Sequence, residues 1–160
     1  MKTSRGFTLV ELMITLAVAA VLVMLAAPSF TTFVKNNRLT AQANTFVASL
    51  NLARSEAIKR GTRVYITSNS GTNWEDGWKV WVDRDGDTTY DSGEELRLEP
   101  AFDGSSTLTG GQSSFTYSAD GLVDNSDDID LCDDRTGETG REIHIGPTGR
   151  ISMESYDSCS

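Results

Sequence analysis

A single carboxylate lies in a mainly apolar segment near the N-terminus, which Thr8 and Thr15 also interrupt. The segment runs from Phe7 to Ala27, Pro28 closes it, and Glu11 is its one charged residue. A carboxylate in an apolar span costs about 2.5–3.5 kcal/mol on insertion scales, so Glu11 requires a partner. If the chain were cut between Gly6 and Phe7, the new α-amine of a neighbouring copy could neutralise it. These residue types predict an assembly contact, with Glu11 as a register device.

The length of the same segment predicts a membrane span. About 20 apolar residues cross a bilayer as a helix, and Lys2 and Arg5 on the N-terminal side favour a cytoplasmic N-terminus. An ordinary secretory signal peptide, cut after Ala17-Val18-Ala19, is one alternative, and a simple membrane anchor is another. The signal peptide would have to tolerate Glu11 and would leave the apolar residues up to Ala27 unexplained.

An acidic loop further along the chain has the oxygen spacing of a calcium site. Residues 83–94 place side-chain oxygens at loop positions 1, 3, 5, 9 and 12, supplied by Asp83, Asp85, Asp87, Asp91 and Glu94. This is the ligand spacing of an EF-hand loop, but the glycine stands at position 4 instead of 6 and strands replace the flanking helices. We favour an acidic hairpin loop without a metal, with calcium as the alternative.

The sequence offers no set of residues for catalysis. His144 is the only histidine, and because it alternates with Ile143 and Ile145 it should lie on the outer face of a strand. No second histidine or free cysteine lies near it in sequence, and no phosphate loop or nucleophile–base set occurs. We therefore expect no enzyme and no cofactor. Cys132 and Cys159 lack metal-type spacing and predict one disulfide in an extracytoplasmic chain.

Two kinds of periodicity predict the elements that position these residues. Apolar residues recur at three- and four-residue steps beyond Pro28, so one helix should run from about Phe7 to Arg60, with Gly61 as its left-handed cap. After Gly61 the period becomes two. The expected strands are residues 63–67, 77–82, 95–99, 114–117, 142–145 and 150–153.

The expected architecture is α+β, a long helix followed by an antiparallel sheet. Trp78, Val80 and Val82 alternate with Lys79 and Trp81. Core and sheet-surface packing is therefore the favoured role of Trp78 and Trp81, over a ligand platform.

The start of the chain resembles the signal of a known class of proteins. Gly6-Phe7-Thr8-Leu9-Val10-Glu11 is similar to the class III signal of type IV prepilins and type II secretion pseudopilins. The resemblance implies that a prepilin peptidase cuts after Gly6 and methylates the amine of Phe7. The implied division is a leader (1–6), a transmembrane and filament-core helix (7–28), an amphipathic helix half (29–61) and a β-rich head (62–160).

The head resembles a narrower group, the GspH/FimT family. The similar blocks are residues 51–57 (NLARSEA), 77–83 (GWKVWVD) with 93–95, and 146–150 (GPTGR), and the late cysteine pair is similar to FimU-like members. The resemblance implies a type IV pilin fold and a minor pilin near the pilus tip that primes assembly and joins tip subunits to the shaft. A minor pseudopilin of a type II secretion system is the alternative.

The resemblance also implies partners and a location. The partners are the prepilin peptidase, the inner-membrane assembly platform, the major pilin and other minor pilins. The chain would cross the inner membrane once with a periplasmic head, and later stand in a pilus at the cell surface.

Nucleic acid is a further possibility that the charge pattern disfavours. Some FimT members bind DNA through a Gly-Arg-x-Arg motif, of which Gly149-Arg150-Ile151-Ser152 keeps only the first arginine. The formal net charge is −9, and acidic residues dominate from Asp76 onward. Arg135 and Arg141 could share a patch with Arg150, but we favour a strand arginine paired with nearby acids.

Overall fold

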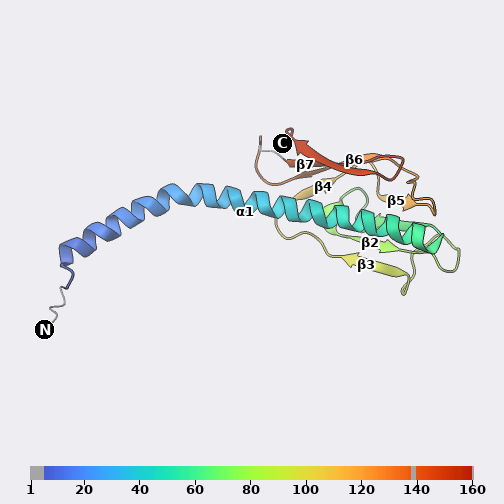
Figure 1. The fold of residues 1–160 in the computed structure, drawn as a ribbon, viewed down its shortest axis with the longest axis horizontal. Helices are drawn as coiled ribbons and strands as arrows, with labels where there is room; N and C mark the ends of the chain where they lie inside the picture. Colours follow the sequence, from blue (N-terminus) through green and yellow to red (C-terminus); the bar gives the residue numbers. More distant parts are fainter. Residues whose placement is uncertain (1–5, 138–139, 160) are drawn as a thin grey trace. The chain divides into compact units, whose positions relative to one another are not determined.

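The computed structural model describes residues 6–137 and 140–159, without the side chains at positions 26 and 28 (Figure 1). Lys2 and Arg5 of the basic leader and the side chain of Pro28 therefore lie outside the described residues. The chain forms two compact units, Met1–Asn37 and Arg38–Ser160. We call the second unit the head. The helix α1, Leu9–Arg60, begins in the first unit and ends in the head.

The C-terminus of α1 is closed as the sequence predicts. Gly61 has a φ of 66°, which favours glycine, and its N–H donates to the Ala57 carbonyl at 2.9 Å. The Gly61 bond is the 5→1 bond of an αL cap, and the Thr62 N–H donates to the same carbonyl at 3.3 Å. Lys59 and Arg60, the basic residues of the last turn, both bind Glu56 in the preceding turn.

The head contains two four-stranded antiparallel sheets, where the sequence analysis expected one. The first has the order β3-β2-β1-β5 and the second β4-β6-β7-β8. The strands are β1 (Val64–Ser68), β2 (Trp78–Trp81), β3 (Glu95–Glu99), β4 (Thr107–Thr109), β5 (Ser114–Tyr117), β6 (Asp127–Cys132), β7 (Gly140–Ile145) and β8 (Ile151–Tyr156). A short 3-10 helix, η1 (Trp74–Asp76), precedes β2.

The prediction of one sheet was wrong because β4 and β6 were missed. In β6, Ile129 and Leu131 are buried, whereas Asp128 is exposed and Asp130 half-buried, so the period of two is present. Aspartate is depleted in strands, and an Asp-rich stretch reads as a turn by composition. β4 has only three residues, and Leu108 is the one that it buries.

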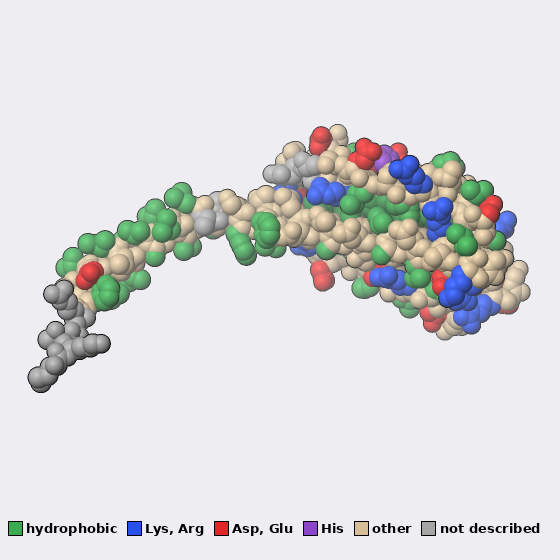
Figure 2. Space-filling view, viewed as in Figure 1, with side chains coloured by type: hydrophobic (Ala, Val, Ile, Leu, Met, Phe, Trp, Pro, Cys, Tyr) green, Lys and Arg blue, Asp and Glu red, His purple; other side chains and the backbone are tan. Residues whose placement is uncertain are grey.

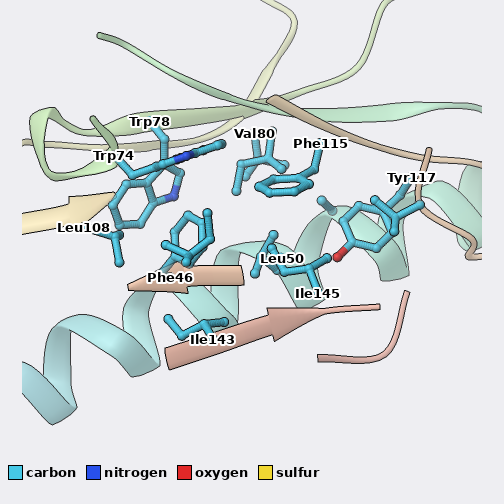
Figure 3. Packing of buried hydrophobic residues seen from close by; sticks show 14 of the residues in the cluster. Phe46, Leu50, Trp74, Trp78, Val80, Leu108, Phe115, Tyr117, Ile143 and Ile145 are labelled. Carbon is cyan, nitrogen blue, oxygen red and sulfur yellow. The ribbon is translucent and has the colours of Figure 1, made fainter. Parts of the chain in front are cut away.

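One hydrophobic core joins α1 to both sheets (Figure 3). Phe46 and Leu50 on α1 are fully buried, and the Phe46 ring packs edge-on at 5.1 Å from the rings of both Trp74 and Trp78. Ile143 and Ile145 of β7 complete the core from the second sheet. Because strands alternate their side chains, this shared core fixes which residues of each strand face outward.

The two tryptophans of β2 occupy opposite faces of the first sheet, as predicted. Trp78 lies in the core, while Trp81 stacks on Tyr65 at 4.3 Å and meets Tyr90 edge-on at 5.9 Å. These rings leave only 4% of Trp81 exposed, and its indole N–H donates to Thr67. Packing on the sheet surface accounts for Trp81 without a ligand.

Candidate assembly segment and sites on the head

The N-terminus of α1 is capped by Thr8. Its hydroxyl oxygen accepts the Glu11 backbone N–H at 3.2 Å, and its carbonyl accepts the Leu12 N–H at 3.1 Å. Glu11 therefore stands in the first turn of α1, where a carboxylate is favoured by the helix dipole. The helix was predicted to begin at Phe7, two residues too early, and this cap was not predicted. The spacing Thr-x-x-Glu, typical of a capping box, was the available signal.

The apolar side chains of the first unit are exposed along α1 (Figure 2). Phe7 is 78% exposed, and every large hydrophobic residue from Leu9 to Leu25 is exposed as well. The Glu11 carboxylate has no ion-pair partner among the described residues. By length and composition α1 could cross a membrane. Its surface can therefore pack against lipid or other helices, and Glu11 is available to a charge from another chain.

Cys132 and Cys159 form a disulfide, as the sequence predicts. The bond ties the end of β6 to the C-terminal tail, and the Gly137 N–H donates to the Cys159 carbonyl. Gly140 lies beneath the bond, where a Cβ would stand 2.5 Å from the Cys159 sulfur and 2.4 Å from the Leu131 carbonyl. A glycine is thus required at position 140, because both the disulfide and the backbone of β6 lie too close for a side chain there.

The acidic loop brings together part of the predicted calcium set. Asp83, Asp85 and Asp87 can each place one carboxylate oxygen within 4.8 Å of the others. Asp91 and Glu94 are not members of that group. The pKa of Asp85 is lowered by the Asp87 N–H but raised overall by desolvation and by the charges of Asp87, Glu94 and Asp83. Three of the five predicted oxygens therefore converge.

Glu94 has a structural role in the same loop. Its side chain is buried, and its two carboxylate oxygens accept the N–H groups of Arg84 at 2.6 Å and Asp91 at 3.0 Å. Asp83 accepts the N–H groups of Gly86 and Thr88 in the same way. These hydrogen bonds to backbone N–H groups hold the loop closed. The Glu94 carboxylate oxygens are used in this way and do not converge with the three aspartates.

His144 has one cross-strand partner, Asp128, that sequence spacing did not indicate. Its Nδ1 lies 2.6 Å from the Asp128 carboxylate on β6, and its Nε2 lies 3.4 Å from Glu142. The hydrogen bond to Asp128 raises the pKa of His144, and the charges of Asp128, Glu142 and Glu154 raise it further, against desolvation. The prediction that His144 faces outward is confirmed. The pairing of β7 with β6 and with β8 brings Asp128 and Glu154 near His144, while Glu142 is its neighbour two residues earlier on β7.

Arg54 connects two of the sequence blocks that carried the resemblance. It lies in the block of residues 51–57, and it donates to the Gly121 carbonyl and the Thr148 carbonyl, each at 3.1 Å. Thr148 lies in the block of residues 146–150, and a Cβ on Gly149 would meet the Gly121 carbonyl at 2.2 Å. The arginine thus fastens α1 to two turns, one after β5 and one between β7 and β8.

Arg150 does not form the basic patch considered above. It lies at the turn before β8, whereas Arg141 lies near the other end of the β7–β8 hairpin, opposite Ser155. Arg141 donates to the Gly140 carbonyl, and Arg135 pairs with Asp133 at 2.7 Å. The favoured pairing of Arg150 with nearby acids is also not seen, since Arg150 is exposed and has no ion pair among the described residues.

Comparisons with known proteins agree with this arrangement. The family model described as Prokaryotic N-terminal methylation motif matches residues 1–27, and that of Type II transport protein GspH matches residues 42–149. Pilin-like protein PilA1 of Thermus thermophilus is 34% identical over 96 residues, which are 59% of this chain. The chain spans only 58% of that relative's length.

Solved structures show the same fold. The type IV minor pilin FimU of Pseudomonas aeruginosa matches in two crystal forms, with TM-scores of 0.67 and 0.63 at 24% and 23% identity. The matches cover 80% and 76% of this chain and 99% of each FimU chain. The GspH family comprises structural pilins and pseudopilins and is not an enzyme family. With its methylation motif and its match to the GspH model over residues 42–149, this chain belongs to the GspH family and has the type IV pilin fold.

Proposed function

We propose that this chain is made as a prepilin and built into a type IV pilus as a minor subunit. The observation that carries the proposal is the exposed apolar surface of α1 in the first unit, with Glu11 in its first turn behind a methylation motif. A helix of this kind satisfies its own backbone in lipid. It can later pack against helices of neighbouring subunits.

The assembly chemistry belongs to Phe7 and Glu11. Prepilin peptidase removes the leader of residues 1–6 by cutting between Gly6 and Phe7, and methylates the new amine. Methylation leaves the amine positive, so it can pair with the Glu11 carboxylate of a neighbouring subunit. Thr8 holds the first turn in helical form, which places Glu11 one turn from the amine.

The location and partners follow from the same features. Residues 7–28 anchor the chain in the inner membrane with the head in the periplasm, and the subunit then moves into the pilus. The disulfide fits an oxidising compartment. As a minor pilin the chain primes assembly and joins tip subunits to the major pilin shaft, with other minor pilins and the assembly platform as partners.

A mass spectrum of the native protein tests processing. Loss of residues 1–6 and a methyl group on the Phe7 amine are expected. An N-terminus at Ala20 would mean ordinary signal cleavage and would contradict the proposal. Glu11→Ala should leave cleavage intact but lower incorporation into sheared filaments, whereas Thr15→Ala, at a nearby exposed polar position, should not.

Two alternatives have their own outcomes. If the chain is a pseudopilin of a type II secretion system, deleting the gene should abolish secretion and leave piliation normal. If it is a minor pilin, the deletion should abolish piliation. The DNA alternative is tested by a gel shift with duplex DNA at physiological salt. We expect no binding, because the head is acidic and because the sequence has Ser152 where the motif that includes Arg150 would have its second arginine. Low-micromolar, salt-sensitive binding that Arg150→Ala abolishes would establish the DNA function instead.

A further inference from the structure

The outer face of the second sheet gathers acidic side chains from three strands around the imidazole of His144. Asp128 of β6 lies opposite His144 of β7, and Glu142 of β7 lies opposite Glu154 of β8. Residues directly opposite one another share a face of the sheet, and so do alternate residues of one strand, so all four side chains leave the sheet on the same side. Figure 2 shows the purple histidine beside red acidic side chains at the edge of the head. Asp128 and Glu154 join the set only through strand pairing, which is why sequence spacing did not indicate it.

The two ring nitrogens of His144 have different surroundings. Nδ1 lies 2.6 Å from the Asp128 carboxylate, and a hydrogen bond of this length keeps the proton of a neutral imidazole on Nδ1. The lone pair of the ring then belongs to Nε2, which forms no hydrogen bond within the part of the chain that the structure describes. A histidine that binds a metal ion almost always donates its other N–H to a carboxylate, a carbonyl or water in this way. His144 is therefore oriented to bind a cation through Nε2.

Glu142 stands at the distance of a second ligand. Its carboxylate lies 3.4 Å from Nε2 of His144. Two ligand atoms bonded at about 2.0–2.2 Å to one tetrahedral zinc ion are about 3.3–3.6 Å apart. One oxygen each of Asp128 and Glu142 and one nitrogen of His144 also lie within 4.8 Å of one another. An ion can thus join Nε2 to Glu142 without a change in the spacing of the two atoms.

Glu154 adds a third ligand and has no other partner. It faces Glu142 across the β7–β8 pair, where Cβ atoms stand about 4.5–5.5 Å apart and two carboxylates repel each other. Glu154 is exposed, and no hydrogen bond or ion pair engages it among the described residues. Its charge is one of those that raise the pKa of His144, so the two groups lie within electrostatic reach. The outward positions of β6, β7 and β8 carry no lysine or arginine that could pair with it.

We propose that the outer face of β7 and β8 binds a zinc ion through His144 Nε2, Glu142 and Glu154, with Asp128 orienting the imidazole. Water fills the fourth position of the tetrahedron. The ligand set favours zinc over calcium, because calcium prefers a shell of oxygens and imidazole nitrogen suits zinc. The ion cross-links β7 to β8 and so stabilises the C-terminal hairpin of the head. This inference does not depend on the proposed function.

Zinc titration of the detergent-solubilised full chain, purified without a histidine tag, tests the site. His144 is the one histidine of the sequence, so its ring nitrogens give a single set of NMR signals. Near pH 7.5, one equivalent of zinc should shift the Nε2 signal strongly while Nδ1 stays protonated, and calorimetry should show one site of low-micromolar affinity. Millimolar calcium should produce neither change.

Ligand variants distinguish coordination from the general attraction of an acidic surface. Glu142→Gln and Glu154→Gln should each weaken zinc binding about tenfold or more, and Asp128→Asn about tenfold, because the imidazole loses its orientation. Asp157→Asn removes an equal charge just beyond β8 and should change the affinity less than about twofold, because salt screens a charge that is not a ligand. Glu154 has no partner among the described residues, so its variant should keep the melting temperature of the metal-free chain.

The acidic loop supplies a second control. Asp83→Ala with Asp87→Ala should leave zinc binding unchanged, because that loop joins strands of the first sheet. A zinc response that the loop variant abolishes, or that Glu154→Gln leaves at wild-type strength, overturns the inference. An unchanged Nε2 signal at millimolar zinc, or an equal response to calcium, also overturns it, since the face would then attract cations without binding them through His144. The proposed pilin function is tested in cells and stands or falls separately from these results.

Discussion

Arg54 fastens the end of α1 to two turns, and Arg54→Ala should therefore destabilise the head strongly. The substitution removes hydrogen bonds to the Gly121 and Thr148 carbonyls, both of 3.1 Å. A hydrogen bond to a charged group contributes about 1.5–3 kcal/mol. The Arg54 side chain is half-buried, and water can partly replace its exposed bond to the Thr148 carbonyl. We therefore expect the free energy of unfolding to fall by about 2–3 kcal/mol in total.

This loss corresponds to a visible change in melting temperature. For a domain of this size, each kcal/mol shifts the midpoint by roughly 3–5 °C, so the decrease should be roughly 6–15 °C. The assay is thermal unfolding of the detergent-solubilised full chain, followed by tryptophan fluorescence. All three tryptophans are buried in the head, so the signal reports its unfolding.

Arg60→Ala is the matched control for Arg54→Ala. Arg60 lies on the same helix and, among the residues that the structure describes, pairs with Glu56 alone, in an exposed i,i+4 contact that should contribute little to stability. Arg54→Lys should give an intermediate loss, because an ammonium cannot match the fork that reaches two carbonyls. Equal melting temperatures for the Arg54→Ala and Arg60→Ala variants would refute the role assigned to Arg54.

Three further predictions concern the other sites of the head. Reducing the disulfide should destabilise the head by about 3–4 kcal/mol in the chain-entropy model, since the cysteines are separated by 27 residues, and thiol labelling of the denatured, unreduced chain should find no reactive cysteine. Millimolar calcium should hardly change the melting temperature; a rise of several degrees that vanishes in Asp83→Ala, Asp87→Ala would instead establish the loop as a site. The pKa of His144, measured by NMR, should lie above about 6.5, and Asp128→Asn should lower it. Because the folded pKa is raised, His144 should stabilise the head fully at pH 5.5 and lose that contribution as the pH rises through the folded pKa, so His144→Gln should destabilise more at pH 5.5 than at pH 8.5.

Local patterns in the sequence determined the helix, its C-terminal cap and six of the strands. A hydrophobic period and a glycine such as Gly61 act over a few residues, so they can be read without knowing the fold. The disulfide was also predictable, because two cysteines allow one pairing within the chain. The N-cap at Thr8 could have been found from the Thr-x-x-Glu spacing.

Only the tertiary structure decided the contacts between distant segments. The division into two sheets depends on β6. Its aspartates are typical of a turn, so the strand, which buries Ile129 and Leu131, was not recognised from the sequence. The environment of His144 depends on the register of β6 against β7, which sets Asp128 opposite it. Arg54, 67 residues before Gly121 and 94 before Thr148, meets both turns only because helix and sheets share one core. Such contacts arise from the packing of whole elements, and no local period of the sequence encodes them.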